Sequence, residues 1–317
     1  MNAVPRVSVV VPTYRRPQRL RRAVASVFRQ TAEDWELIIV DDNDPGSPER
    51  RETEEVVAEL AGDERVRYIR SPRNAGGGAA RNMGIREARS ALVAFLDDDD
   101  EWHATKLERQ LRCFDEVPPE VGLVYCRVRV LDTSTGRESL TPTDGRSHSV
   151  RDLLRRNTVG TTSAVMCRTE ALRAVGSFDE SLPARQDLDL YIRLAQQYPF
   201  AFVDEPLVTL YVHRGSRISS DFGGAIRAHQ LFVDKYRPLI EGDRAAQNAL
   251  RYQLGYFLFA AGRFTEARAV LAKAWRNDPT DLSILTRLAL TFALPRAAAG
   301  SLRRMLAWCR LARRSPF

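Results

Sequence analysis

A short apolar run that ends in four consecutive aspartates constrains this chain more than any other feature. Residues 91–96 are all apolar, which is typical of a buried strand, and residues 97–100 are all aspartate. Adjacent carboxylates at the end of a strand repel one another and lose hydration, so we expect a cation to sit among them. A solvated acidic loop, or a helix N-terminus that collects carboxylates next to its dipole, is the alternative interpretation.

The cation that such a cluster favours is divalent. Mg²⁺ and Mn²⁺ prefer hard oxygen ligands and are usually held by one or two protein carboxylates, while water and substrate phosphates fill the remaining positions. A nucleoside diphosphate is therefore the natural second ligand of the ion. The cluster predicts Mg²⁺ or Mn²⁺ as a cofactor.

Length and composition limit the classes of protein to which the chain can belong. Its 317 residues are enough for one large domain and an appendage. Since no apolar run approaches the ~18 residues of a membrane span, we expect neither a transmembrane helix nor a signal peptide. The cysteines lack the spacing of a metal site or a disulfide framework, which is typical of reduced thiols in the cytoplasm: Cys113, Cys126, Cys167 and Cys309.

The net charge of +7 is unevenly distributed along the chain. Residues 1–222 carry 32 basic and 35 acidic side chains, whereas residues 223–317 carry 16 basic and 6 acidic side chains. The N-terminal part is thus slightly acidic, and it contains none of the usual nucleic-acid-binding motifs. We therefore expect no nucleic-acid partner.

Strand and helix patterns alternate along the first hundred residues. The predicted strands are 7–11, 35–40, 66–69 and 91–96, and the predicted helices between them begin at Pro17, Pro48 and Ala79. Repeated β–α units predict a mostly parallel sheet that is covered by helices on both faces.

Polar residues follow three of these predicted strands. They are Pro12-Thr13-Tyr14, Asp41-Asp42 and the aspartate run. Because ligands of parallel sheets bind beyond the carboxyl ends of the strands, we expect these three groups to converge on one site.

The middle of the chain departs from this alternation. We expect a helix around Leu107, a strand at 121–131, a polar loop at 132–148, a strand at 161–167 and a helix that opens at residues 185–190. Acids at a helix start usually cap the helix, so capping is the alternative interpretation of Asp187 and Asp189.

Six motifs in this order closely resemble the family 2 inverting glycosyltransferases of GT-A fold. They are VSVVVPTY at 7–14, IVDDN at 39–43, RNAG at 73–76, AARNMGI at 79–85, FLDDDD at 95–100 and QDLDL at 186–190. The resemblance covers roughly residues 5–220. It implies an α/β fold with a GT-A, Rossmann-like sheet flanked by helices in a catalytic domain at 1–222, followed by a helical region at 223–317.

The resemblance also implies a role for individual residues. The residues that match nucleotide-binding positions are Pro12, Thr13, Tyr14, Asp42, Asn74, Arg81, Asp97 and Asp98. In the family's pattern Tyr14 stacks on the base, Asp42 accepts a base N–H and Arg81 lies near the diphosphate. Asp99 is expected to bind the metal, together with Asp97 of the Asp-x-Asp motif and His213.

Asp187 matches the general base that takes the proton from the acceptor hydroxyl. The residue before it is usually glutamate and is Gln186 here, which changes the local charge. The resemblance thus implies an inverting, metal-dependent glycosyltransferase of the hexosyltransferase class. Its expected donor is a UDP-sugar and its expected acceptor is a glycan or a lipid-linked molecule in surface polysaccharide or glycoconjugate synthesis.

The C-terminal region needs a separate interpretation. Residues 248–281 resemble one tetratricopeptide-like hairpin, which must pack on something because a single repeat cannot bury its own apolar face. Residues 285–317 combine apolar residues with arginines, which fits either a helix on an anionic membrane surface or a helix docked on the protein itself. We therefore expect a cytoplasmic location, with the inner face of the membrane as one alternative.

Three other functions compete with glycosyl transfer. A nucleotidyltransferase needs a glycine-rich phosphate loop after the first strand, where this chain has Pro12-Thr13-Tyr14. A glycosidase needs two carboxylates flanking the bond and no nucleotide site. A non-catalytic module that binds a nucleotide sugar, or acts as a scaffold, is the third, and donor turnover distinguishes it from an enzyme.

Overall fold

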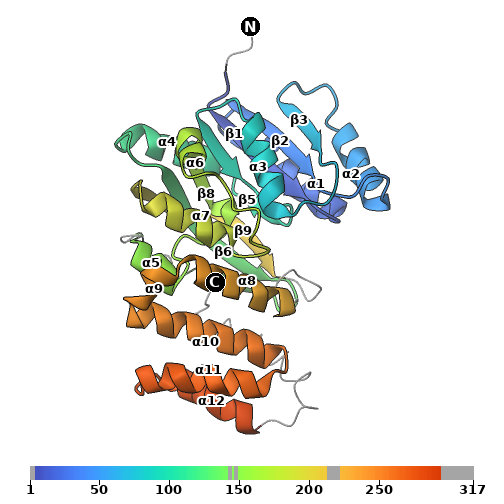
Figure 1. The fold of residues 1–317 in the computed structure, drawn as a ribbon. Coiled ribbons are helices and arrows are strands. Elements are labelled where there is room, and N and C mark those ends of the chain that lie inside the picture. Colours follow the sequence, from blue (N-terminus) through green and yellow to red (C-terminus); the bar gives the residue numbers. More distant parts are fainter. Residues whose placement is uncertain (1–3, 142–144, 146–148, 213–221, 294–317) are drawn as a thin grey trace. The chain divides into compact units, whose positions relative to one another are not determined.

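The computed structural model describes residues 4–141, 145, 149–212 and 222–293 (Figure 1). The chain forms two compact units, which we describe separately. The first unit draws on residues 1–148, 159–181 and 186–214, and the second on residues 149–158, 182–185 and 215–317. A single boundary had been predicted at residue 222. In the structure two short earlier segments, residues 149–158 and 182–185, also belong to the second unit.

The first unit begins with the predicted β–α alternation. Its elements up to the aspartate run are β1 (Val7–Thr13), α1 (Pro17–Phe28), β2 (Trp35–Asp41), α2 (Pro48–Ala58), β3 (Val66–Arg70), α3 (Gly77–Glu87) and β4 (Leu92–Phe95). The later elements are β5 (Asp100–Trp102), α4 (Lys106–Glu116), β6 (Leu123–Asp132), β7 (Arg137–Leu140), a 3₁₀ turn (Thr162–Ala164), β8 (Val165–Arg168), α6 (Thr169–Ala174), α7 (Gln186–Ala195) and β9 (Phe200–Val212).

The predicted α/β fold is confirmed, but the sheet is mixed rather than mostly parallel. Its strand order is β3-β2-β1-β4-β8-β6-β9-β5, with β7 paired to β6. Strands β3, β2, β1 and β4 are parallel to one another, whereas β8 runs antiparallel to both β4 and β6. The sequence pattern predicted the parallel half because only there does a helix separate each strand from the next.

Two strands of the other half had no clear signal in the sequence. β9 is only half-buried along most of its length and carries Asp204, Glu205 and Pro206. Its pairing with β6 is irregular around Arg127, where the register shifts. The short β5 lies at the end of the aspartate run and pairs with β9. β5 is too short to show a pattern, and Asp204, Glu205 and Pro206 interrupt the apolar residues of β9, so neither strand appears as one continuous apolar run or a strict alternation.

Two segments differ in detail from their predictions. The polar stretch at 132–148 contains a hairpin, in which Asp132 accepts backbone N–H bonds from Ser134 and Thr135 before β7 returns along β6. The strand expected at 161–167 begins as a 3₁₀ turn, because the Thr161 side chain accepts the N–H of Ser163 (3.4 Å) and bends the chain.

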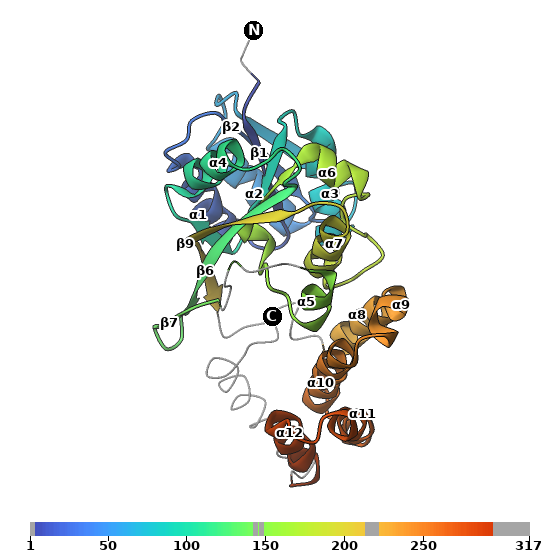
Figure 2. The same ribbon diagram turned by 90° about the vertical axis from the view of Figure 1, so that its left-hand side faces the viewer.

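Helices cover both faces of the sheet (Figure 2). Val9 and its neighbours on the same face of β1 pack in one apolar cluster with residues of α1 and α4, such as Leu20 and Leu107. Val10 points to the opposite face, where α3 approaches so closely that a Cβ at Gly84 would lie 2.3 Å from a Val10 methyl. β1 is therefore buried on both faces, and its carboxyl end is held in a fixed position.

The second unit is helical. Its elements are α5 (Val150–Arg155), α8 (Phe222–Lys235), α9 (Arg237–Glu241), α10 (Arg244–Ala260), α11 (Phe264–Asn277) and α12 (Leu282–Ala293). Asp243 caps α10 and also pairs with Arg155 of α5 (2.9 Å). In the part of the chain that the structure describes, no helix combines the length and apolar character needed to cross a membrane.

Lys106 is a titratable group in the core of the first unit, and its burial predicts how stability depends on pH. Its amine is fully buried 3.7 Å from the Trp102 ring centroid and has no hydrogen-bond partner among the described residues. Burial lowers the pKa of Lys106 to about 7, so above that pH the unfolded chain holds a proton that the folded chain lacks. Stability should therefore rise with pH above about 7, by up to about 1.4 kcal/mol per pH unit.

We expect Lys106→Met to abolish this rise, because methionine keeps the contact with Trp102 and cannot titrate. Urea unfolding between pH 6 and 9 measures the effect. Lys273→Met, at an exposed position of α11, is the control and should keep the wild-type slope. Parallel pH profiles for wild type and Lys106→Met would show that the amine remains charged in the fold.

Candidate active site

The carboxyl ends of β1 and β4 meet through a buried aspartate. Thr13 Oγ1 donates a hydrogen bond to Asp98 Oδ2 (2.9 Å), and the Tyr14 N–H reaches the same oxygen (3.3 Å). The next residue, Arg15, has a φ of +56° and donates its N–H to Asn43 Oδ1 (2.8 Å). The chain thus turns sharply after Tyr14 in a strained conformation that the neighbouring strand end holds in place.

Asp42 joins this group from the end of β2. Its N–H donates to the Thr13 carbonyl (2.9 Å), and its two carboxylate oxygens accept the N–H groups of Ala75 (2.9 Å) and Gly76 (2.8 Å). Asn74, which is exposed, accepts the Gly76 N–H as well (3.2 Å). Asp42 therefore holds the loop that leads into α3, and a ligand would have to use its remaining lone pairs.

Each aspartate of the run has a different environment. Asp97 pairs with Arg81 and accepts the Thr162 hydroxyl (3.1 and 3.2 Å), while Asp100 is buried and accepts the Ser163 hydroxyl (2.6 Å). Burial raises the pKa of Asp98 to about 6, against the opposing effect of Arg16. Burial and the neighbouring carboxylates also raise the pKa of Asp100 well above its usual value.

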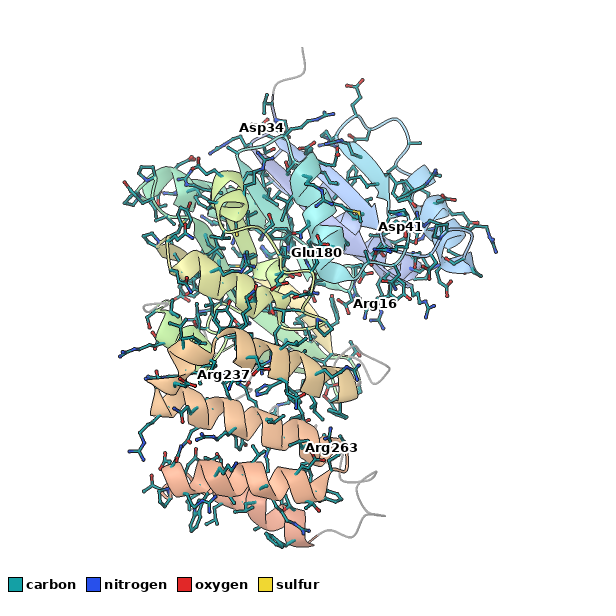
Figure 3. All side chains as sticks on the ribbon, viewed as in Figure 1. Arg16, Asp34, Asp41, Glu180, Arg237 and Arg263 are labelled. Carbon is teal, nitrogen blue, oxygen red and sulfur yellow. The ribbon has the colours of Figure 1, made fainter. Side chains whose placement is uncertain are left out.

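Three arginines of α1 and its N-cap supply positive charge around the run, and sequence analysis missed them (Arg16 is labelled in Figure 3). Arg16 Nη1 lies 3.2 Å from Asp98 Oδ1 and 2.8 Å from Asp99 Oδ2, and Arg19 Nη1 lies 3.5 Å from the same Asp99 oxygen. Arg22 donates to the Asp99 carbonyl (2.9 Å). Their i, i+3, i+6 spacing places them on one helix face, and this spacing is the pattern by which the sequence could have revealed a basic face near the site.

The sequence predicts a cation, preferably divalent, among the carboxylates of the run, and this prediction did not include arginine as that cation. Guanidinium groups of Arg16, Arg19 and Arg81 pair with its carboxylates in this structure. Within the described residues, no group of three or more His, Cys, Asp or Glu side chains is arranged to hold a metal ion. His213, the third predicted metal ligand, lies outside the described residues.

The oxygen donors nevertheless suit a Mg²⁺ or Mn²⁺ ion that one carboxylate holds. Asp99 is the best placed of the four, because its side chain is 22% exposed and its contacts with Arg16 and Arg19 both use one carboxylate oxygen, Oδ2. Asp97 has both oxygens engaged, and Asp100 is buried. One carboxylate, water and substrate phosphates are enough for either ion.

Asp187 lies in the first turn of α7 and shares Arg81 with the aspartate run. The Arg81 guanidinium pairs with Asp97 and lies within electrostatic range of Asp187 and of the buried Tyr191. Burial, followed by the Asp187 charge, raises the pKa of Tyr191 well above its usual value. One cation thus connects the predicted base with the predicted nucleotide site.

The two residues that flank Asp187 have separate positions. The Gln186 side chain lies against the start of α3, where a Cβ at Gly78 would be 3.1 Å from its amide. Asp189 is fully buried and pairs with Arg193 of the same helix (2.7 Å). Asp189 is therefore a structural residue, and Asp187 is the partly exposed carboxylate of this helix start.

The model of the family described as Glycosyl transferase family 2 matches residues 8–181, and a tetratricopeptide repeat model matches residues 248–291. An uncharacterized glycosyltransferase of Methanocaldococcus jannaschii is 30% identical over 208 residues, which are 64% of this chain and 70% of that protein. An Escherichia coli protein named as a colanic acid biosynthesis glycosyl transferase, WcaA, is 30% identical over 260 residues, or 79% and 86% of the two chains.

Solved structures show the same fold. Staphylococcus aureus TarS 1–349 in complex with UDP-GlcNAc has a TM-score of 0.60 at 15% identity, covering 94% of this chain and 92% of that one. The mannosyltransferase PcManGT of Pyrobaculum calidifontis, in complex with GDP-Man and Mn²⁺, has a TM-score of 0.57 at 19% identity, covering 97% and 85%.

Ser163 tests how the aspartate run is held. Its hydroxyl accepts the Asp97 N–H (3.0 Å) and donates to the buried Asp100. We expect Ser163→Ala to lower the free energy of unfolding by about 1–3 kcal/mol, because it leaves buried polar groups without a partner. Ser181 makes a bond of the same length (2.6 Å) to Asp179 at an exposed site, so Ser181→Ala should cost less than about 0.5 kcal/mol. Equal losses in urea unfolding would contradict the proposed role of burial.

Proposed function

Because the chain belongs to glycosyl transferase family 2, we propose that it moves a sugar from a nucleotide diphosphate sugar to an acceptor hydroxyl with inversion at the anomeric carbon. The observation that carries this proposal is that Arg81 pairs with Asp97 and also lies within electrostatic range of Asp187. A cation between a phosphate site and a general base can stabilise the leaving group without neutralising the base.

The residues at the strand ends supply the donor site in this proposal. Tyr14 offers a ring for stacking on the base, and Asp42 offers lone pairs for a base N–H. Arg81 faces the diphosphate, where negative charge grows as the bond to the sugar breaks. We propose a UDP-sugar as the donor, which the UDP-GlcNAc complex of the structurally similar TarS supports.

Asp187 acts as the base. Its carboxylate takes the proton from the acceptor hydroxyl as the oxygen attacks the sugar carbon, and a correctly oriented acceptor lowers the entropic part of the barrier. One base and no covalent intermediate lead to inversion. The acceptor is a glycan or a lipid-linked molecule in surface polysaccharide synthesis, which the name of the relative WcaA supports.

A divalent ion completes the proposed site. Asp99 would hold Mg²⁺ or Mn²⁺, with Asp97 as a neighbouring carboxylate, and the ion would supply Lewis-acid stabilisation of the diphosphate. Asp99 must then give up its contacts with Arg16 and Arg19. The Mn²⁺ complex of PcManGT supports this part of the proposal.

Asp187→Asn separates binding from chemistry. The asparagine keeps the shape of the side chain but cannot accept the proton, so we expect UDP binding with Mn²⁺ to stay within about twofold and transfer to fall by about 10²–10⁴. Calorimetry with UDP and GDP measures binding, and release of nucleoside diphosphate from a panel of nucleotide sugars measures turnover. Asp115→Asn, at an exposed surface pair, is the control.

Transfer at the wild-type rate by Asp187→Asn would rule out this base. Donor binding by the wild type without any turnover over the whole panel would instead favour the non-catalytic module. Proton NMR of the product's anomeric centre tests inversion.

Asp99→Asn tests the ion. An amide is a weaker ligand for hard cations than a carboxylate, so we expect Mn²⁺ binding in the presence of UDP to weaken by at least about tenfold. Electron paramagnetic resonance of free Mn²⁺ measures this without any need for turnover. Unchanged Mn²⁺ affinity would remove Asp99 from the metal site while leaving the role of Asp187 untouched.

A further inference from the structure

Two arginines at the start of α1 meet the same carboxylate oxygen of the aspartate run. Arg16 Nη1 lies 2.8 Å and Arg19 Nη1 lies 3.5 Å from Asp99 Oδ2. Arg16 has a second acid, because the same nitrogen lies 3.2 Å from Asp98 Oδ1. Within the described residues, the ion pair with Asp99 is the only polar side-chain contact of Arg19. The charge of Arg19 is therefore balanced by Asp99 alone.

Arg21, on the same helix, shows that this arrangement is particular to Arg19. The side chains of Arg19 and Arg21 are both 38% exposed. Arg21 pairs with Glu59 of the C-terminal end of α2, away from the aspartate run. Exposure is thus equal at the two positions, and the difference lies in the acid that each arginine uses.

Arg19 and a divalent ion require the same carboxylate. A positive charge within ion-pair range of Asp99 opposes the binding of a second cation there, and an ion that binds takes from Arg19 its acidic partner. The charges of the ion and Arg19 together exceed the single charge of Asp99. The two ionised phosphates of a nucleotide sugar balance this excess.

Phosphate is also the anion that an arginine side chain fits best. A guanidinium group presents several N–H donors in a planar fork, which matches the oxygens of a phosphate and forms charge-assisted hydrogen bonds. A Mg²⁺ ion lies about 2.1 Å from each oxygen that it binds, so it would bring a phosphate oxygen within about 4 Å of Asp99. A guanidinium nitrogen 3.5 Å from Asp99 reaches that phosphate by rotation of the side chain.

We propose that Arg19 binds the diphosphate of the donor, and that before the donor binds it competes with the divalent ion for Asp99. This inference rests on the proposed function, because it requires a nucleotide diphosphate beside the aspartate run. Arg19 weakens binding of the ion alone and strengthens binding of the ion together with the diphosphate. By linkage, the ion and the donor each raise the affinity for the other.

The alternative is that Arg19 only neutralises the aspartate run. Removal of its charge would then favour the ion, but it would leave the affinity for UDP at saturating Mn²⁺ unchanged. The proposal instead predicts changes of opposite sign for the ion alone and for UDP. A partly unfolded variant cannot produce opposite changes, since it loses affinity for both.

Arg19→Met tests both parts of the proposal. We expect Mn²⁺ alone to bind about three- to tenfold more tightly, because a competing charge is removed. We expect UDP at saturating Mn²⁺ to bind at least about tenfold more weakly, because charge-assisted hydrogen bonds to phosphate are lost. Electron paramagnetic resonance of free Mn²⁺ measures the first affinity and calorimetry the second. Arg19 is the better position for this test than Arg16, which also neutralises the buried Asp98.

Arg21→Met is the matched control. It removes the same charge from the same helix at a position of equal exposure, so we expect both affinities to stay within about twofold of the wild type. Arg19→Lys separates charge from shape. Lysine keeps the positive charge but lacks the planar fork, so Mn²⁺ alone should bind as in the wild type, while UDP should bind with an affinity between those of the wild type and Arg19→Met.

The possible results distinguish this inference from the proposed function. Wild-type affinity for UDP in Arg19→Met, or equal losses in Arg19→Met and Arg21→Met, would overturn the inference and leave the proposed function in place. Weaker binding of Mn²⁺ alone by Arg19→Met would overturn the competition for Asp99. Failure of the wild type to bind UDP with Mn²⁺ would overturn both the proposed function and this inference.

Discussion

Pairing between arginines and the aspartate run is the interaction on which the site depends. Four adjacent carboxylates at the edge of a buried sheet carry a large desolvation cost, and the raised pKa of Asp98 and Asp100 reflects it. Arg16 and Arg19 from the start of α1, and Arg81 from α3, provide compensating charge. The same contacts fix both helices to the ends of the strands. These ion pairs therefore determine both the charge balance and the geometry of the site.

Because their partners differ, the aspartates of the run have different environments. Asp97 is held by Arg81 and Thr162, and Asp100 belongs to a buried contact with Ser163. Asp99 is partly exposed, and both of its arginine contacts use the same oxygen, Oδ2. A sequence motif of four identical residues thus becomes four distinct environments, because neighbouring side chains leave a strand end in different directions.

The C-terminal unit follows a separate principle. Its hairpin of α10 and α11 is stabilised by close contact at Gly255 and by capping at Asp243, and the chain uses the same capping again at Asp281. Repeats of this kind bury apolar faces only against their neighbours.

Sequence alone determined the parallel half of the sheet and the convergence of Thr13, Asp42 and Asp98, because continuous apolar runs and polar strand ends are local signals. It could not determine that β8 runs antiparallel to its neighbours, since an apolar run predicts a strand but not its direction, nor that β9 joins the sheet, since a half-buried strand with charged residues has no clear period. Tertiary structure also decided which cations meet the aspartates. Arg16 and Asp99 are 83 residues apart in the chain, and only the packing of α1 against β5 brings their charges together.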